Sequence, residues 1–333
     1  LDSNRGDVDA WLKFVATSNT DFGPATATIK LVSNNINGTG NWNTAHKVVG
    51  VGEAWVGIGD TTMLMAGYKA SIFNIGDDAP LNYLGLFNSQ SVNTGVGFVT
   101  KGATTAGDVI QVVSNLGNGL SVGGGLEGLN GLGFGEVTGV GVLNYAGDGL
   151  TAHVSAAAGN GGWKVHAGFT GAWDPIKVVA AVSADDTGYW NALGSVAATF
   201  DMFTLAASGE ATSAGEWGVG GSASAKVTDG VTINLGGRYF HGVSDAGTHN
   251  TAHAYEVYQV EAGLAAAVTE TLTLTGAVGY TDSTIFGSVT PAAFYGNAGI
   301  AWAPGGGFTS SASIGADSLG GYKAIFKAAK TIK

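Results

Sequence analysis

The chain has no cysteine and no long hydrophobic run, and each absence removes a class of protein. Without cysteine, its 333 residues have no disulfide framework, no thiolate metal site and no cysteine nucleophile. No stretch of about 18 or more apolar residues occurs, which excludes a transmembrane helix of the usual kind. Any membrane-spanning structure would therefore have to be built from β-strands.

Charged residues and proline are also scarce. Asp, Glu, Lys and Arg make up 12% of the sequence, roughly half the share typical of soluble domains, and proline occurs 5 times against 57 glycines. A soluble protein of this length needs more polar surface than this composition supplies. Low charge without a hydrophobic helix leaves a membrane β-barrel, a glycine-rich β-solenoid or a fibrous protein, and the collagen triplet repeat is absent.

Among the few charges, acids exceed bases. The 14 basic and 25 acidic residues give a formal net charge of −11. Nucleic acid is therefore not an expected partner, because binding it requires a basic face.

A period of two is the main secondary-structure signal. In "DGVTINLGGRYFH" (229–241), apolar Val231, Ile233 and Leu235 alternate with polar residues that include Asn234 and Arg238. The same alternation occurs in "WKVHAGFTGAW" (163–173), "PIKVVAAVS" (175–183) and "ATATIKLV" (25–32). No long stretch has a helical repeat, so we predict an all-β protein whose strands have one apolar and one polar face.

Short turns and variable loops alternate along the chain. Nine similar strand openings follow tight turns, seven of them with an acid in or beside the turn: Asp21, Asp60, Asp148, Asp174, Asp201, Asp229 and Glu270. Aspartate and glycine suit such turns because they tolerate the required backbone conformations. The intervening connections vary and include longer segments at 34–46, 241–253 and 281–291. This asymmetry is typical of outer-membrane barrels.

The polar face decides between a soluble core and a lipid-facing wall. Its residues are mostly Gly, Ala, Ser and Thr with widely spaced charges, which suits a water-filled interior better than the outside of a soluble sandwich. We therefore predict a transmembrane antiparallel β-barrel of about 16 to 20 strands, forming one domain over residues 1–333. A barrel of that size encloses water. A β-solenoid is the alternative, although it should show one fixed short repeat.

One insertion is much longer than the other connections. After a predicted strand from Thr62 to Phe73, about 30 residues (74–107) precede the next strand. They contain Asp77 and Asp78, followed by the apolar segment "LNYLGLF". We predict that this loop folds into the barrel, with Asp77 and Asp78 at the narrowest point. The alternative is a surface loop with a solvated acid pair.

Part of the sequence resembles a known family. "VGEAWVGIGDTTMLMAGYKASIF", the long loop, and "VIQVVSNLGNGLSVGGGLEG" are similar to the alphaproteobacterial (rhizobial-type) porins, and the resemblance covers about residues 7–130. It implies a trimeric outer-membrane channel with an acidic constriction loop opposite basic wall residues. The arginine cluster usual in that family is not matched, because the only arginines are Arg5 and Arg238.

The alternation also predicts which charges line the pore. Inward placement avoids the cost of about 2–4 kcal/mol for a basic side chain in lipid. The predicted pore-lining charges are Lys13, Lys30, Glu53, Lys69, Lys164, Lys177, Glu210, Lys226, Arg238 and Glu261. They could set up a field that orients polar solutes, or they could simply wet the lumen and pair with their neighbours.

Signals for an enzyme, a metal site or a cofactor are weak. His249 and His253 are four residues apart, but in a loop rather than on a helix. No "GxSxG" nucleophile motif occurs, and the glycine-rich segments precede no helix. We therefore expect no catalytic residues, no metal and no cofactor.

The sequence as a whole predicts an outer-membrane porin. It should pass small hydrophilic solutes and ions by diffusion, with a mild preference for cations. Its expected surroundings are outer-membrane lipid and lipopolysaccharide, and its expected assembly is a homotrimer. A glycine-rich structural or adhesive surface protein is the alternative.

Overall fold

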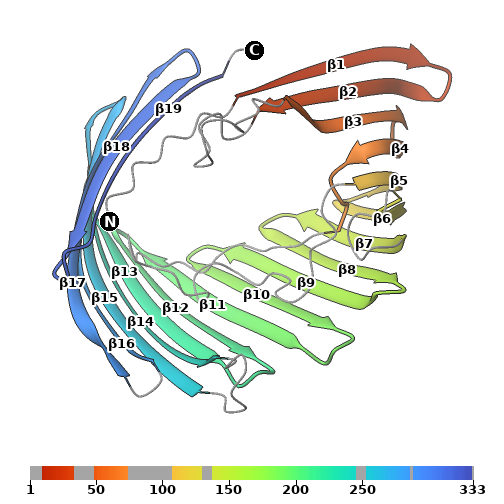
Figure 1. The fold of residues 1–333 in the computed structure, drawn as a ribbon. Coiled ribbons are helices and arrows are strands. Elements are labelled where there is room, and N and C mark those ends of the chain that lie inside the picture. Colours follow the sequence, from red (N-terminus) through yellow and green to blue (C-terminus); the bar gives the residue numbers. More distant parts are fainter. Residues whose placement is uncertain are drawn as a thin grey trace, which may run out of the picture. The chain divides into compact units, whose positions relative to one another are not determined.

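The computed structural model describes residues 10–33, 49–73, 107–129, 137–244, 253–285 and 288–331. These residues form 19 strands of one antiparallel sheet and no helix (Figure 1). The prediction of an all-β protein with 16 to 20 strands is confirmed. Across the described residues, no helix is both long and apolar enough to cross a membrane.

The chain divides into two compact units. The first comprises residues 1–75 and 98–167, and the second comprises 76–97 and 168–333. Strand β9 (Gly162–Trp173) contributes residues to both units.

The first unit is a run of hairpins. Each strand from β1 to β7 hydrogen bonds antiparallel to the strand that follows it in the chain. The strands are β1 (Ala10–Thr20), β2 (Gly23–Ser33), β3 (Gly50–Gly59), β4 (Thr62–Lys69), β5 (Gly107–Gly117), β6 (Leu120–Glu127), β7 (Thr138–Gly147) and β8 (Leu150–Gly159).

The second unit continues the same pattern. From β10 to β19, every strand pairs antiparallel with the next one in sequence. The strands are β10 (Ile176–Asp185), β11 (Trp190–Phe200), β12 (Phe203–Thr212), β13 (Trp217–Thr228), β14 (Val231–Ser244), β15 (His253–Thr269), β16 (Leu272–Ile285), β17 (Ser288–Gly305), β18 (Phe308–Asp317) and β19 (Tyr322–Lys330).

The nine predicted tight turns are all two-residue connections in the structure. They run from Asp21–Phe22 at the first hairpin to Gly306–Gly307 near the end of the chain. At the turn after β5, Gly119 has a φ of 81°, and a Cβ atom there would lie 1.9 Å from the carbonyl oxygen of Ala146. Only glycine fits that position, because other residues lack both the conformation and the space.

The burial of side chains on the two faces of the sheet is the reverse of that in a soluble protein, because large hydrophobic side chains are exposed and polar ones are buried. We define the outer face of each unit as the one with exposed large hydrophobic side chains, and the inner face as the opposite one. On β14, Leu235 is 55% exposed on the outer face, whereas Arg238 is 6% exposed on the inner face. The first unit has the same division, with Val56 exposed and Gln111 fully buried.

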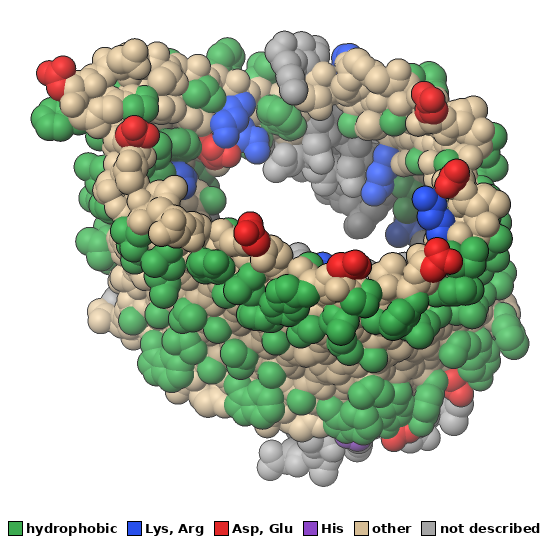
Figure 2. Space-filling model, turned by 180° about the vertical axis from the view of Figure 1, so that it is seen from behind, with side chains coloured by type: hydrophobic (Ala, Val, Ile, Leu, Met, Phe, Trp, Pro, Cys, Tyr) green, Lys and Arg blue, Asp and Glu red, His purple; other side chains and the backbone are tan. Residues whose placement is uncertain are grey.

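This reversal identifies the class of fold. Figure 2 shows hydrophobic side chains gathered in a broad band over the outside of the wall, with few charges among them. A sheet that exposes leucine and valine while burying arginine and glutamate has the side-chain arrangement of a transmembrane antiparallel β-barrel, which is the predicted fold class.

Candidate functional site

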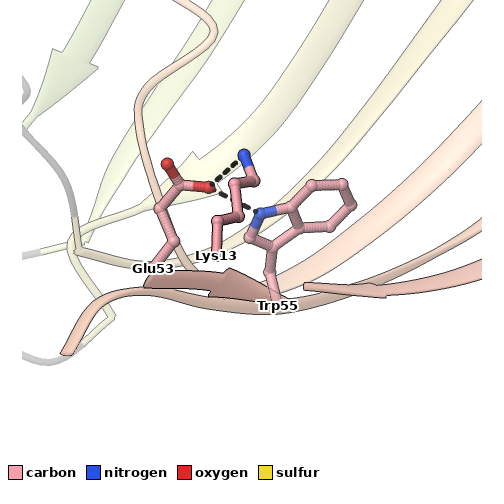
Figure 3. Close-up of polar contacts among 3 residues, drawn as sticks. All are labelled: Lys13, Glu53 and Trp55. Carbon is pink, nitrogen blue, oxygen red and sulfur yellow. Dashed lines mark hydrogen bonds and ion pairs between the residues drawn. The ribbon is translucent and has the colours of Figure 1, made fainter. Parts of the chain in front are cut away.

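An ion pair spans three strands on the inner face of the first unit. Lys13 Nζ lies 3.2 Å from Glu53 Oε2, and Trp55 Nε1 donates a hydrogen bond to the same oxygen at 3.3 Å (Figure 3). Lys30 of β2 lies between the two charges, opposite Lys13 in one ladder and opposite Glu53 in the other. The carboxylate is thereby fixed between a base and an indole, and both charged side chains still contact solvent.

Two lysines on this face make cation–π contacts with tryptophan rings. Lys30 Nζ lies 5.7 Å from the ring centre of Trp11, and Lys69 Nζ lies 5.6 Å from that of Trp55. Both distances fall within the range of cation–π attraction. The structure therefore brings together four of the predicted pore-lining charges: Lys13, Lys30, Glu53 and Lys69.

A buried amide connects Lys69 to a second carboxylate. Gln111 Oε1 accepts a hydrogen bond from Lys69 Nζ at 3.3 Å, while its Nε2 donates to Glu127 Oε1 at 2.8 Å and to the carbonyl oxygen of Ala70 at 3.1 Å. Gln111 and Glu127 are both buried. Neither was predicted, although Gln111 stands at the inner position of its strand between outward Ile110 and Val112.

The predicted strand from Thr62 to Phe73 is too long. Strand β4 ends at Lys69. The residues after it leave the ladder because their backbone groups hydrogen bond to side chains of distant strands instead. Glu127 Oε1 accepts a hydrogen bond from the amide of Ile72 at 3.0 Å. This contact joins residues 55 apart in the sequence, so the local alternation could not reveal it.

After β4 the chain lies against the inner face. Phe73 is buried in a cluster with Val140 of β7 and Ala157 of β8, and Ile72 packs against this cluster. Val140 and Ala157 are inner-face residues, because their neighbours in sequence are exposed on the other side. The residues that lead into the long insertion therefore cross the inside of the wall.

The strands β8 and β9 carry further buried polar groups. Lys164 and His166 are buried on the same face of β9, and Ser155 is buried on β8. Lys164 thus lies on the inner face of β9.

The second unit contains a buried polar network on three strands. Arg238 Nε donates to Gln259 Oε1 at 3.0 Å, Gln259 Nε2 donates to the Tyr295 hydroxyl at 2.6 Å, and that hydroxyl donates to Glu261 Oε2 at 2.9 Å. All four side chains are buried. Arg238 and Glu261 were predicted on this face. Gln259 and Tyr295 were not predicted there, because neither side chain is charged.

The remaining predicted charges lie on strands β10, β12 and β13 of the second unit. Lys226 Nζ lies 3.8 Å from Asp229 Oδ1, and both side chains are highly exposed at a tight turn. Lys177 lies one residue inside the tight-turn end of β10, and Glu210 lies opposite buried Leu193 in the β11–β12 ladder.

The predicted constriction residues belong to the insertion 74–107. Asp77 and Asp78 lie outside the residues that the structure describes. In the described ranges, no group of three or more His, Cys, Asp or Glu side chains is placed to hold a metal ion.

Comparison with known proteins gives structural matches only. Neither a protein-family model nor a curated protein matches the sequence, so no sequence match supports the alphaproteobacterial family in particular. Among solved structures, OccK5 (OpdH) of Pseudomonas aeruginosa is 12% identical, with a TM-score of 0.48 and coverage of 92% of each chain. OccK9 (OpdG) of the same organism is 11% identical, with a TM-score of 0.45 and coverage of 96% of this chain and 97% of that one. A mutant of the Rhodobacter blastica porin is 13% identical, with a TM-score of 0.43 and coverage of 88% and 89%.

Proposed function

We propose that this chain forms a water-filled channel through the bacterial outer membrane for small hydrophilic solutes and ions. The reversed burial is the observation that carries the proposal. Leu235 and Val260 face outward and are exposed, whereas Arg238 and Glu261 face inward on the same two strands. A basic side chain that faced lipid instead would cost about 2–4 kcal/mol.

The number of strands supports an open interior rather than a packed one. Barrels of about 8 strands are filled by side chains, whereas barrels of about 16 to 18 enclose water. The described residues alone supply 19 strands. We propose that they belong to one β-barrel domain over residues 1–333.

The inner face supports a hydrophilic cargo. Lys13 and Lys30 flank Glu53 on one part of the wall, and the Lys13–Glu53 pair contacts solvent. Lys69 lies over the ring of Trp55, the residue that donates a hydrogen bond to Glu53. Charges of both signs at such a site attract and orient polar solutes without forming a closed pocket for one of them. Diffusion of small hydrophilic molecules is the function that requires no more than this.

Selectivity and constriction are further parts of the proposal. The net charge of −11 favours a mild preference for cations. We place the narrowest point at the insertion 74–107, with Asp77 and Asp78 at its rim. The support is the course of the chain just before it, because Phe73 packs on the inner face of β7 and β8.

The proposed surroundings follow from the apolar outer face and from the family resemblance. The outer face suits membrane lipid, and an outer-membrane barrel also contacts lipopolysaccharide. The homotrimer is implied by the resemblance to porins. A β-solenoid does not fit, because solenoids stack parallel strands, whereas the strand ladders of both units are antiparallel. We propose no enzymatic activity.

Planar-bilayer recording tests the function directly. The purified chain should insert as ion-conducting channels, and a salt gradient should give a reversal potential of the sign expected for mild cation preference. Absence of conductance from a correctly folded, detergent-soluble protein would overturn the channel. Clear anion preference would leave the channel intact but contradict the proposed selectivity.

A further inference from the structure

Two histidines of successive strands meet on the inner face of the first unit. His153 Nε2 of β8 lies 3.0 Å from His166 Nδ1 of β9. The ring centres are 4.8 Å apart and the ring planes are tilted by 33°, so the rings meet at an angle. His166 is buried while His153 is only half-buried, which leaves the pair open to solvent from the side of His153.

We propose that this pair binds a divalent transition-metal ion, with Cu²⁺ as the best fit. Neutral imidazole nitrogens are good ligands for Cu²⁺, Ni²⁺ and Zn²⁺. With metal–nitrogen distances of about 2.0–2.1 Å, nitrogens 3.0 Å apart subtend an angle of about 95° at a shared metal ion. A near-right angle suits the tetragonal sites of Cu²⁺ and Ni²⁺ better than the tetrahedral sites of Zn²⁺.

The proton balance allows the exchange of a hydrogen bond for a metal ion. At 3.0 Å, one facing nitrogen donates its N–H and the other accepts it, so the accepting ring is neutral in that state. When the metal ion binds, the donated proton leaves the facing nitrogen, either for the other nitrogen of the same ring or for solvent, and both facing nitrogens become ligands. The metal ion and that proton therefore compete for the same nitrogen.

The surroundings limit the site to two protein nitrogens. The described residues offer no cluster of three or more His, Cys, Asp or Glu side chains for a metal ion, so water is expected to complete the coordination. Asn144 lies opposite His153 in the β7–β8 ladder and adds only a weak amide donor. Lys164 shares the inner face two residues before His166, and its charge lowers the affinity for a cation. The site goes beyond the proposed channel and does not depend on it.

The test is copper binding by the full chain in detergent after removal of metals with a chelator. His249 and His253 are replaced by glutamine in the background, because two histidines four residues apart could bind copper on their own. We expect one Cu²⁺ per chain by titration calorimetry, and an electron paramagnetic resonance spectrum with two equatorial nitrogens. Ni²⁺ and Zn²⁺ should bind more weakly, in keeping with the Irving–Williams order.

Substitutions at the pair give the decisive result. H153Q should abolish the two-nitrogen spectrum and weaken binding at least tenfold, and H166Q should do the same if the buried position tolerates it. H241Q, which changes a histidine stacked on Trp217 of the second unit, is the matched control and should leave binding unchanged. K164Q should tighten binding. Retention of the two-nitrogen spectrum by folded H153Q, or absence of stoichiometric copper from the background chain, would overturn the proposal.

Discussion

The ring of Tyr295 lies directly over Gly279, its partner across the β16–β17 ladder. A Cβ atom on Gly279 would lie 2.3 Å from Tyr295 Cζ, so the tyrosine occupies the space that any other residue would fill. By crossing the intervening strand in this way, its hydroxyl group reaches both Gln259 and Glu261 on β15. The absence of a side chain at Gly279 thus permits a polar contact that reaches from β17 across β16 to β15.

Replacing Gly279 with alanine should therefore destabilise the second unit. The added methyl group displaces the Tyr295 ring, and overpacking of this kind costs about 1–3 kcal/mol. Denaturant unfolding in detergent should show a lower midpoint. G194A is the matched control, because a Cβ atom at that strand glycine meets nothing within 4 Å. In a chain that already carries Y295A, G279A should cost little, and a full cost in that background would contradict the steric explanation.

Lysine at Leu235 should be far more harmful than lysine at its neighbour Asn234. Leu235 faces outward and is 55% exposed, so its replacement places a charge in lipid at a cost of about 2–4 kcal/mol near mid-membrane. Asn234 faces the other side, where a charge contacts water. Refolding yield and unfolding midpoint in lipid vesicles should fall for L235K and remain close to wild type for N234K. Equal losses would contradict the assignment of the two faces.

Replacing Gln111 with leucine should loosen the start of the long insertion. The change keeps the volume but removes the donor to Glu127 and to the Ala70 carbonyl oxygen, leaving buried polar atoms unsatisfied at a cost of about 1–3 kcal/mol. Protease sensitivity near residues 70–73 should rise, together with a lower unfolding midpoint. I110L on the outer face is the control and should alter neither quantity measurably.

Replacing Glu53 with glutamine should change selectivity more than stability. Because the Lys13–Glu53 pair contacts solvent, its loss should cost about 0–1 kcal/mol. Removing the negative charge leaves Lys13, Lys30 and Lys69 unbalanced on the wall. The reversal potential under a salt gradient should therefore move toward anions. D229N, which removes the acid of an exposed pair at a tight turn, should leave it unchanged. An unchanged potential in E53Q would mean that this charge does not face the permeation path.

The double replacement D77N/D78N should lower the cation preference and leave folding intact. In a narrow aqueous neck, two carboxylates act on passing ions at short range, where salt screens them less than in bulk. Deleting the loop between Asn74 and Gly107 should also raise the single-channel conductance. If the reversal potential and the conductance both stayed at their wild-type values, the loop would lie outside the pore.

Local chemistry explains what the sequence could predict. The two-residue turns could be located because aspartate and glycine favour them regardless of distant residues, and Asp60 and Asp148 occupy such turns. Facing directions could be assigned because side chains alternate strictly along a strand. That alternation is enough to place Arg238 and Leu235 on opposite faces of β14, since they are an odd number of residues apart.

The features that the sequence could not predict depend on contacts between segments that are distant along the chain. The end of β4 depends on Gln111 and Glu127, which lie more than 40 residues further along the chain. The approach of Lys13 to Glu53 depends on the register of two ladders. Tyr295 was not predicted because its side chain is uncharged. Its place in the network also depends on Gly279, which lies one strand away.

The pairing of each strand with its neighbours in sequence also constrains how this wall can change in size. Duplicating the hairpin β7–β8 would add two strands and leave the direction and the faces of every later strand as they are. Inserting a single strand would instead reverse all later strands and move their tight turns to the opposite end. We therefore expect the number of strands to vary among related and engineered forms of this protein in steps of two, that is, of one whole hairpin.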